Sequence, residues 1–375
     1  MTETSDDWRG SVMLVLGSST GGIGQHVLSL VRGLVAAGCP VLVCAPAATD
    51  EHFGFTAAGA DFLPVEIPAS PGPLDSGAIR ALRKAFAGRA IDVVHAHGLR
   101  AGFVAVLARP AVPIVVTWHN AVLAKGLRGQ ASAVVERIVA RGATLTLGAS
   151  EDLVERARTL GAREVRLGAV AAPELAPAKR TRAQVRAEFR LPAGVPLILS
   201  VGRLHPQKRY DVLIEAAARW RDLTPAPVVV VAGSGPSYMG LAQRASETRA
   251  RVYLLGHRTD VPDLLAGADL AVVSSDWEAR QLFAQEALRA GVPLVATAVG
   301  GLPGLVGDAV VPVPPGDVDA LDAAVRGLLA DPQRRADYAA RGPRQAATWP
   351  NEEDTVTDVR AAYGSVTAEA RAGRG

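Results

Sequence analysis

Residues 268–298 constrain the fold more than any other stretch, because they contain a complete strand–helix–strand pattern. The apolar run at 268–273 is typical of a buried strand. Helix-forming residues follow at 283–290, and Gly291 and Pro293 stand where a helix ends. The apolar residues after Pro293 then indicate the next strand. Units of this kind build parallel sheets covered by helices, so the sequence predicts an α/β fold.

Two acids lie in this unit, Glu278 in the loop and Glu286 inside the predicted helix. The first backbone N–H groups of that helix, from residue 279 to residue 283, point toward the carboxyl end of the strand and form a site for phosphates. A carboxylate beside a phosphate is repelled by the negative charge of the phosphate. Such a carboxylate is better suited to accept hydrogen bonds from hydroxyl groups of the ligand. The combination predicts a ligand with phosphates and a polyol, such as a sugar nucleotide. The alternative is that both glutamates are solvated acids on a surface helix.

The composition is that of an ordinary soluble protein, with 375 residues, 49% hydrophobic residues and 21% charged residues. This length is enough for two domains with separate cores. The two cysteines, Cys39 and Cys44, face opposite sides of a predicted strand, so we expect free thiols and a cytoplasmic location. The acidic, polar N-terminus does not resemble a signal peptide, and no apolar run reaches the length of a membrane span.

The formal net charge of +3 is too small to predict nucleic-acid binding. It leaves open a peripheral contact with an anionic membrane surface, at the inner face of the cell membrane. Residues 123–140 form a predicted helix with basic residues among its apolar positions, namely Lys125, Arg128, Arg137 and Arg141. We interpret this segment as a domain helix with a solvated basic face rather than as a helix lying on a membrane.

The first half of the chain begins with a β–α–β pattern. It has a strand at 11–17, a glycine-rich turn, a helix at 25–37 and a strand at 41–45. A glycine-rich first turn also occurs in proteins that bind nicotinamide dinucleotides. Here the turn lacks the G-x-G-x-x-G spacing, and no acid stands at the end of the second strand to bind a ribose. We therefore predict no nicotinamide cofactor.

Two further predicted strands in this half end in polar residues. The strand at 91–94 leads into His95 and His97, and the strand at 114–116 leads toward His119. The site of an open α/β sheet lies at such strand ends, so these side chains are expected near it. The spacing of His95 and His97 would suit a metal, but no Asp or Cys cluster accompanies them and we predict no metal site.

The second half starts after a proline- and alanine-rich segment at 171–179, which is the expected interdomain linker. A strand at 196–201 then ends in a loop that carries Arg203 and Lys208. Basic side chains between a strand and a helix form a clamp for anions. The alternative for this loop is a solvated basic turn. A last polar helix is predicted at 351–370.

The spacing of Glu278 and Glu286, followed by Gly291 and Pro293, resembles the donor-site motif of retaining family-4 glycosyltransferases. The Gly-Arg-x-x-x-x-Lys pattern at residues 202–208 and the glycine-rich first turn are similar to that family as well. The resemblance covers nearly the whole chain. It implies the GT-B fold, in which two Rossmann-like domains face each other with the donor cleft between them.

The resemblance also assigns roles to individual residues. In that family the first glutamate contacts hydroxyls of the donor sugar and the second contacts those of the ribose, which implies these roles for Glu278 and Glu286. The arginine and the lysine clamp the donor diphosphate, which implies that role for Arg203 and Lys208. His119 resembles the histidine that lies near the donor sugar and the reacting centre. His119, Glu278, Arg203 and Lys208 are therefore the expected catalytic residues.

Further donor contacts are implied at the glycine turns and at the nucleobase segment. In the family, the first glycine loop lets the backbone approach the donor phosphates, and a second tight turn lies near them. The nucleobase is held largely through backbone groups of a later loop. The residues of this chain that match these features are Gly22, Gly24, Gly235, His257 and Arg258.

The chain departs from the family directly after the first glutamate. Where the family commonly has Gly-Phe-Gly, this chain has Ala279, Arg280, Gln281 and Leu282. Backbone amides stay available there, while the larger side chains alter the choice of sugar or contact a phosphate. We therefore count Arg280, Gln281 and Leu282 among the expected donor-binding residues.

The resemblance implies an acceptor domain at residues 1–172, a donor domain at 173–350 and a helix at 351–375 that packs back on the first domain. It implies a retaining hexosyltransferase of cell envelope biosynthesis that uses a UDP- or GDP-sugar, a sugar, lipid or small-molecule acceptor, and neither metal nor cofactor. Two alternatives stay open. One is a sugar-nucleotide epimerase of GT-B fold, and the other is a nucleotide-sugar-binding protein that lost turnover through Arg280 and Gln281.

Overall fold

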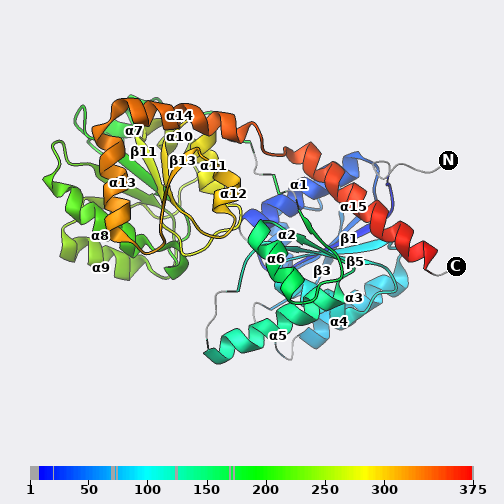
Figure 1. The fold of residues 1–375 in the computed structure, drawn as a ribbon. Helices are drawn as coiled ribbons and strands as arrows, with labels where there is room; N and C mark the ends of the chain where they lie inside the picture. Colours follow the sequence, from blue (N-terminus) through cyan, green and yellow to red (C-terminus); the bar gives the residue numbers. More distant parts are fainter. Residues whose placement is uncertain are drawn as a thin grey trace. The chain divides into compact units, whose positions relative to one another are not determined.

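A computed structural model describes residues 8–19, 21–68, 72, 75–122, 126–168, 170–171 and 174–373. The chain forms two compact units, Met1–Pro173 together with Pro350–Gly375, and Glu174–Trp349. Each unit is an α/β domain with its own sheet (Figure 1). The boundaries between the units lie one residue from those expected from the sequence. Within the described residues, no helix is both long enough and apolar enough to cross a membrane.

The first unit has a seven-stranded parallel sheet of order β3-β2-β1-β4-β5-β6-β7. Its described strands are β1 (Val12–Leu16), β2 (Val41–Ala45), β3 (Asp61–Pro64), β4 (Val93–His97), β5 (Ile114–Trp118), β6 (Leu145–Gly148) and β7 (Val165–Leu167). Its described helices are α1 (Gly22–Ala36), α2 (Ala47–Phe53), α3 (Asp75–Gly88), α4 (Leu99–Ala108), α5 (Gly126–Gly142), α6 (Glu151–Thr159) and α15 (Glu352–Ala372). The parallel α/β architecture predicted from the sequence is confirmed.

The second unit has a six-stranded parallel sheet of order β10-β9-β8-β11-β12-β13. Its strands are β8 (Leu197–Val201), β9 (Val228–Ala232), β10 (Val252–Leu254), β11 (Leu270–Val273), β12 (Leu294–Thr297) and β13 (Val310–Val313). Its α-helices are α7 (Arg182–Glu188), α8 (Tyr210–Arg219), α9 (Tyr238–Thr248), α10 (Val261–Gly267), α11 (Leu282–Arg289), α12 (Leu302–Val306), α13 (Val318–Ala330) and α14 (Pro332–Ala346). Short 3-10 helices occupy Pro206–Lys208 and Trp220–Asp222.

Most residues of the central strands are apolar because helices cover both faces of each sheet. In β8, for example, Leu197 and Leu199 join one apolar cluster while Ile198 joins the cluster on the opposite face. All five residues of β9 are buried. A strand buried on both faces is read in the sequence as a continuous run of valines and leucines, which is why these strands could be predicted.

The C-terminal helix α15 packs on the first unit, against α1 (Figure 1, red and blue). The two helices approach closely at Gly33, where a Cβ atom would lie 2.3 Å from Cγ2 of Val356. Asn351 starts α15 with a capping box, in which its side chain and that of Asp354 bond each other's backbone N–H. Tyr363, further along α15, is fully buried in the core of this unit.

Pro312 lies inside β13, which is tolerated because β13 is the edge strand and proline has no N–H to donate. The hydroxyl of Ser150, directly before α6, bonds the carboxylate of Asp152 and makes no capping bond. The basic helix expected at residues 123–140 corresponds to α5, which is described from Gly126 on; Lys125 and the side chain of Arg128 lie outside the described residues.

Candidate functional site

The carboxyl ends of β8 and β11 bring Glu278 and Lys208 together in the second unit. The Nζ atom of Lys208 lies 2.5 Å from Oε1 of Glu278. The hydroxyl of Ser275 donates to the same oxygen, also at 2.5 Å. Glu278 is only 7% exposed, so its carboxylate is held by a cation and a hydroxyl at the edge of the sheet. A buried carboxylate needs such partners.

Backbone contacts fix the loop that carries Glu278. Gln207 donates its side-chain amide to the carbonyl of Trp277, and its own carbonyl accepts from the N–H of Asp276. The carbonyl of Glu278 accepts from the N–H of Gly301 at 2.8 Å. Gly300, with φ of 53°, leaves room for this carbonyl, because a Cβ atom there would lie 2.2 Å from it. The loops after β8, β11 and β12 are therefore joined at the site.

Arg203 lies on the same loop as Lys208, and its side chain is exposed. Burial lowers the pKa of His205, and the positive charges of Arg203 and Lys208 lower it further. The loop after β8 is thus a region of positive potential. The structure pairs Lys208 with Glu278, whereas the side chain of Arg203 is exposed.

Arg280 is half-buried, and its Nε and Nη2 atoms are buried without a hydrogen-bond partner. Burial lowers the pKa of its guanidinium, and Arg289 adds like-charge repulsion. Removing such a group from water without a partner is costly, so its position indicates an anionic ligand. Arg280 stands where the family motif commonly has phenylalanine, so it adds a positive charge at this position.

Gln281 was expected to bind the donor, and in the structure its side chain makes a hydrogen bond within the protein. It is the N-cap residue of α11, and its side-chain oxygen accepts from the N–H of Ala284 at 2.5 Å. Its side chain is therefore used inside the protein. Leu282 begins the helix and is half-buried.

Glu286 lies within α11 and is half-buried. Burial raises its pKa to about 7, and the charge of Arg289 opposes that rise. A carboxyl group with such a pKa lies in an environment that provides little solvation for its charge. Hydroxyl donors of a ligand would supply the hydrogen bonds that the ionised form needs.

Two tight turns lie beside this site. Gly235 packs against the loop after β8, since a Cβ atom on it would lie 2.3 Å from the carbonyl oxygen of Leu204. His257 is exposed in the loop after β10. The side chain of Arg258 is paired with Glu188 and Asp260, which raise its pKa. In this loop, therefore, the His257 side chain is exposed while the Arg258 guanidinium is engaged.

The glycines of the first turn differ from each other in the structure. Gly22 is exposed at the start of α1. Gly24 is buried, and a Cβ atom on it would lie 2.1 Å from Cε2 of Phe53. Its N–H bonds the hydroxyl of Ser19 at 3.1 Å. Gly24 is thus required by the packing of α1 on α2, whereas Gly22 is exposed.

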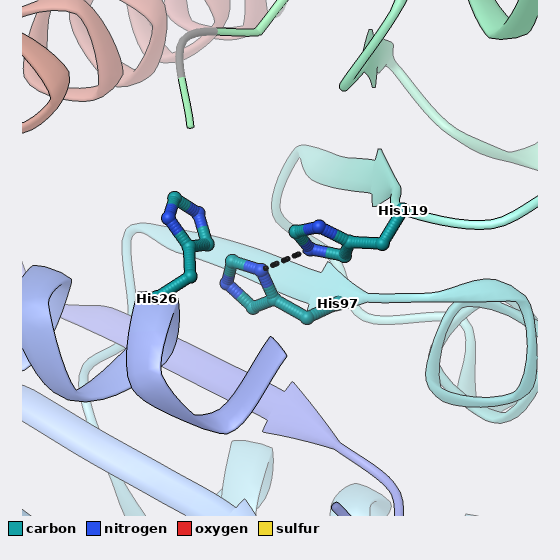
Figure 2. Close-up of side chains that lie close together, drawn as sticks. All are labelled: His26, His97 and His119. Carbon is teal, nitrogen blue, oxygen red and sulfur yellow. Dashed lines mark hydrogen bonds between the residues drawn. The ribbon is translucent and has the colours of Figure 1, made fainter. Parts of the chain in front are cut away.

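Three histidines meet in the first unit at the carboxyl edge of its sheet (Figure 2). His97 ends β4, His119 follows β5, and His26 lies on α1. The Nδ1 atom of His97 is 3.3 Å from Nε2 of His119. Burial lowers the pKa of both rings well below the usual value, and the neighbouring histidines lower it further. Both rings are uncharged at neutral pH.

His95, two residues before His97, does not belong to this cluster. The two nitrogens of His95 are already bonded, Nδ1 to the hydroxyl of Tyr363 and Nε2 to that of Thr117, each at 2.7 Å. His95 is therefore a structural residue of the core. His26 was missed as a partner, because one histidine on an amphipathic helix carries no signal of what the fold places opposite it.

Family models and sequence relatives of one kind, glycosyltransferases, match most of this chain. The model of "Glycosyl transferase 4-like domain" matches residues 21–173, and that of "Glycosyl transferases group 1" matches residues 181–345. A D-inositol 3-phosphate glycosyltransferase of Salinispora tropica is 36% identical over 340 residues, covering 82% of this chain and 70% of that protein. The enzyme of the same name from Salinispora arenicola is 34% identical, covering 81% and 75%.

Solved structures of low sequence identity share the fold. A sucrose-phosphate synthase of Thermosynechococcus elongatus has a TM-score of 0.79 at 22% identity, covering 96% of this chain and 100% of that chain. HepE of Anabaena, solved in complex with UDP, has a TM-score of 0.77 at 19% identity, covering 95% and 100%. With both halves matched by family models and the fold matched over nearly its whole length, the chain belongs to the family-4 glycosyltransferases of GT-B architecture.

Proposed function

We propose that this glycosyltransferase moves a hexose from a nucleoside-diphosphate sugar to an acceptor hydroxyl, with retained configuration and without a metal ion. The observation that carries the proposal is the contact between Lys208 and Glu278 at the carboxyl edge of the second sheet. A cation for the diphosphate and a carboxylate for sugar hydroxyls stand there side by side. The second unit would be the donor domain and the first the acceptor domain.

The residues of the chain supply what the reaction needs. The bond between the anomeric carbon and the diphosphate oxygen breaks, and negative charge develops on the leaving group. Arg203, Lys208 and the N-terminal amides of α11 would stabilise that charge. Arg280, whose buried nitrogens lack partners, would bind a phosphate oxygen. These groups do the work that a divalent cation does in other transferases.

The configuration at the anomeric carbon is retained if the acceptor attacks the sugar from the same face from which the diphosphate leaves. The acceptor oxygen then forms a bond to the anomeric carbon, and its proton passes to the departing phosphate oxygen. Glu278 would bind hydroxyls of the sugar ring, and its contacts with Lys208 and Ser275 hold it in place rather than free it as a nucleophile. Neutral His119 would donate a hydrogen bond near the reacting centre, and Glu286 would bind the ribose.

The comparisons support a uridine donor and a polyol acceptor without deciding either. HepE of Anabaena was solved with UDP and with UDP-glucose, and the curated relatives are named for D-inositol 3-phosphate. We therefore place UDP-glucose first among donors, with GDP-sugars next. Acceptors to test are phosphorylated polyols, sugars and lipids, and a place in cell envelope biosynthesis follows for a lipid acceptor.

We also propose that the protein works in the cytoplasm and, in place of the solvated face inferred from the sequence, that the exposed apolar residues of α5 give it peripheral contact with the membrane. Val134 and Ile138 on α5 are 55% and 37% exposed, one turn apart. Arg137 and Arg141 are exposed on the same helix. An apolar strip with basic neighbours suits an anionic lipid surface. Sedimentation with phosphatidylglycerol vesicles, but not with phosphatidylcholine vesicles, is the expected result.

A donor and acceptor screen tests the function. The purified protein is incubated with UDP-, GDP- and ADP-sugars, with and without acceptors, and both nucleotide release and glycosylated product are measured. Product that forms with one donor in wild type and falls strongly in Lys208→Ala is the expected result. The matched control is Lys179→Ala, whose side chain is exposed in the same unit. Nucleotide release without any acceptor favours an epimerase, and donor binding without product favours a binding protein.

A further inference from the structure

We propose that His26, His97 and His119 form a binding site for a transition-metal ion of the Zn²⁺ class. Each of the three side chains offers one imidazole nitrogen, and the three nitrogens all lie within 4.8 Å of one another. Figure 2 shows the rings converging from α1, from the end of β4 and from the segment after β5. The described part of the chain contains no other group of three His, Cys, Asp or Glu residues with this geometry.

The distances are close to those of a tetrahedral site. Two nitrogens bound to one zinc ion at about 2.0–2.1 Å lie about 3.3 Å apart in tetrahedral geometry. The Nδ1 atom of His97 and the Nε2 atom of His119 are already 3.3 Å apart. The widest separation in the cluster is at most 4.8 Å, so a shift of about 1.5 Å by imidazole rotation would complete the site.

The elements that carry the ligands are rigid, which favours a preformed site. His97 is the last residue of β4, and its strand partner is Thr117 in β5, two residues before His119. His26 lies on the buried face of α1. The three residues are 5%, 3% and 8% exposed in the order His26, His97 and His119. A cluster held this way loses little entropy when it binds an ion.

An unsatisfied polar atom lies in the same cluster. The Nε2 atom of His97 is buried and has no hydrogen-bond partner. Buried polar groups are normally paired, so this nitrogen indicates an absent partner such as a solvent molecule, while the other nitrogen of the ring, Nδ1, is the one that faces His119. His95 does not belong to the site, because Tyr363 and Thr117 bond both of its nitrogens.

The donor set selects the class of metal. Imidazole nitrogens suit Zn²⁺, Cu²⁺, Ni²⁺ and Co²⁺, whereas Mg²⁺ and Ca²⁺ require oxygen ligands. Three protein ligands leave a fourth position for a water molecule.

The metal would inhibit sugar transfer rather than support it. This consequence rests on the proposed function, in which His119 lies beside the donor sugar. An ion bound at Nε2 of His119 takes the nitrogen that faces the cluster and fixes the direction of the ring, so the ring can no longer turn or change tautomer to donate that hydrogen bond from Nε2. Metal binding itself does not depend on that assignment, so the two statements are tested separately.

Binding is tested on the full-length protein after removal of metals. Zn²⁺ is titrated in competition with a chromophoric chelator, and Co²⁺ is titrated while the visible absorption of a tetrahedral complex is recorded. We expect one site per chain in wild type. His97→Gln and His26→Gln should each weaken the affinity at least about tenfold and reduce the Co²⁺ absorption, since loss of a direct ligand costs at least as much as loss of a supporting residue.

His52→Gln is the matched control, because His52 is exposed on α2 in the same unit and lies outside the cluster. It should bind Zn²⁺ and Co²⁺ as wild type does. Circular dichroism and thermal unfolding identify a variant that has lost its fold, and two separate variants keep the test decisive if one fails. Wild type without a one-to-one site, or both cluster variants with unchanged affinity, would overturn the proposal.

Inhibition is tested with the donor and acceptor that give product. Zn²⁺ should inhibit wild type and His52→Gln, with recovery on addition of chelator. His26→Gln should show a much smaller ratio between its activities without and with Zn²⁺. Equal Zn²⁺ inhibition of His26→Gln and wild type would refute the inhibitory role. A stoichiometric Zn²⁺ site in a protein that transfers no sugar would refute the proposed function and leave the metal site standing.

Discussion

Lys208 has two partners in the proposed reaction cycle, Glu278 before the donor arrives and the diphosphate afterwards. In the structure its ammonium group is bound to Glu278 Oε1, while Arg203 lies exposed on the same loop. A diphosphate carries more negative charge than one carboxylate, so the cation can be transferred to it. The ion pair thus gives the buried carboxylate of Glu278 a partner and holds the ammonium group of Lys208 in position for a phosphate.

Replacing Arg203 or Lys208 by alanine should weaken donor binding about tenfold or more, because each change removes a charge-assisted hydrogen bond of about 1.5–3 kcal/mol. Calorimetry with the nucleotide sugar measures the change. Lys179→Ala should bind the donor as wild type does. Unchanged affinity in both site variants would show that this loop is a solvated basic turn.

Substitutions of Glu278 and of Glu286 should change different kinetic parameters. Glu286→Ala removes contacts with the ribose, which does not change during the reaction, and should raise the donor KM with little effect on kcat. Glu278→Gln alters contacts at the reacting sugar and should reduce kcat strongly while UDP alone binds almost as before. Glu247→Gln, exposed on α9, is the control. Full kcat in Glu278→Gln would mean that the motif is structural.

Donor affinity should depend on the ionisation of Glu286. Burial raises its pKa from 4.5 to about 7, so the carboxyl is mostly protonated at pH 6 and mostly ionised at pH 8. The ionised form accepts hydroxyl donors more strongly. The donor KM should therefore fall as the pH rises through about 7, and Glu286→Gln should lose this dependence. Steady-state kinetics between pH 6 and pH 8 make the comparison, and an identical pH profile in both proteins contradicts the assignment.

At the scale of elements, the N-cap residue of α11 stabilises the helix through its side chain. Gln281 caps the helix through the N–H of Ala284. Gln281→Ala should lower the free energy of unfolding by about 0.5–2 kcal/mol. Gln281→Asp, which can still cap, should recover most of that loss. Urea unfolding of the three proteins measures it, and equal stability of the alanine variant would show that the cap contributes nothing.

The strand and helix pattern of both units was predictable because most central strands are largely apolar runs between glycine, proline and polar residues. The predictions missed β3, whose burial is partial, and α14, which contains Pro343. They also missed α2, which starts directly after Pro46. These elements lack a local signal of their own, and packing against the rest of each unit decides them.

At the scale of the whole molecule, transfer should not require a divalent cation, because arginine and lysine side chains supply the positive charge at the diphosphate. Activity in EDTA should equal or exceed activity in untreated buffer, the excess arising if zinc is removed from the histidine cluster. Product formation assayed with EDTA and then with added Mn²⁺ tests this. Complete loss in EDTA with recovery in Mn²⁺ would show that the reaction uses a metal.

The sequence by itself determined the alternation of strands and helices, the parallel sheets, the family, and the strand ends that carry Arg203, Lys208, Glu278 and His119. These follow from local patterns, since a strand end and a helix start are set by neighbouring residues. The tertiary structure alone decided which of them meet. Lys208 and Glu278, separated by 70 residues, are joined because β8 and β11 are adjacent in the sheet. His26 joins His97 and His119 because α1 packs over the edge where β4 and β5 end, and contacts between distant segments depend on the packing of the whole unit.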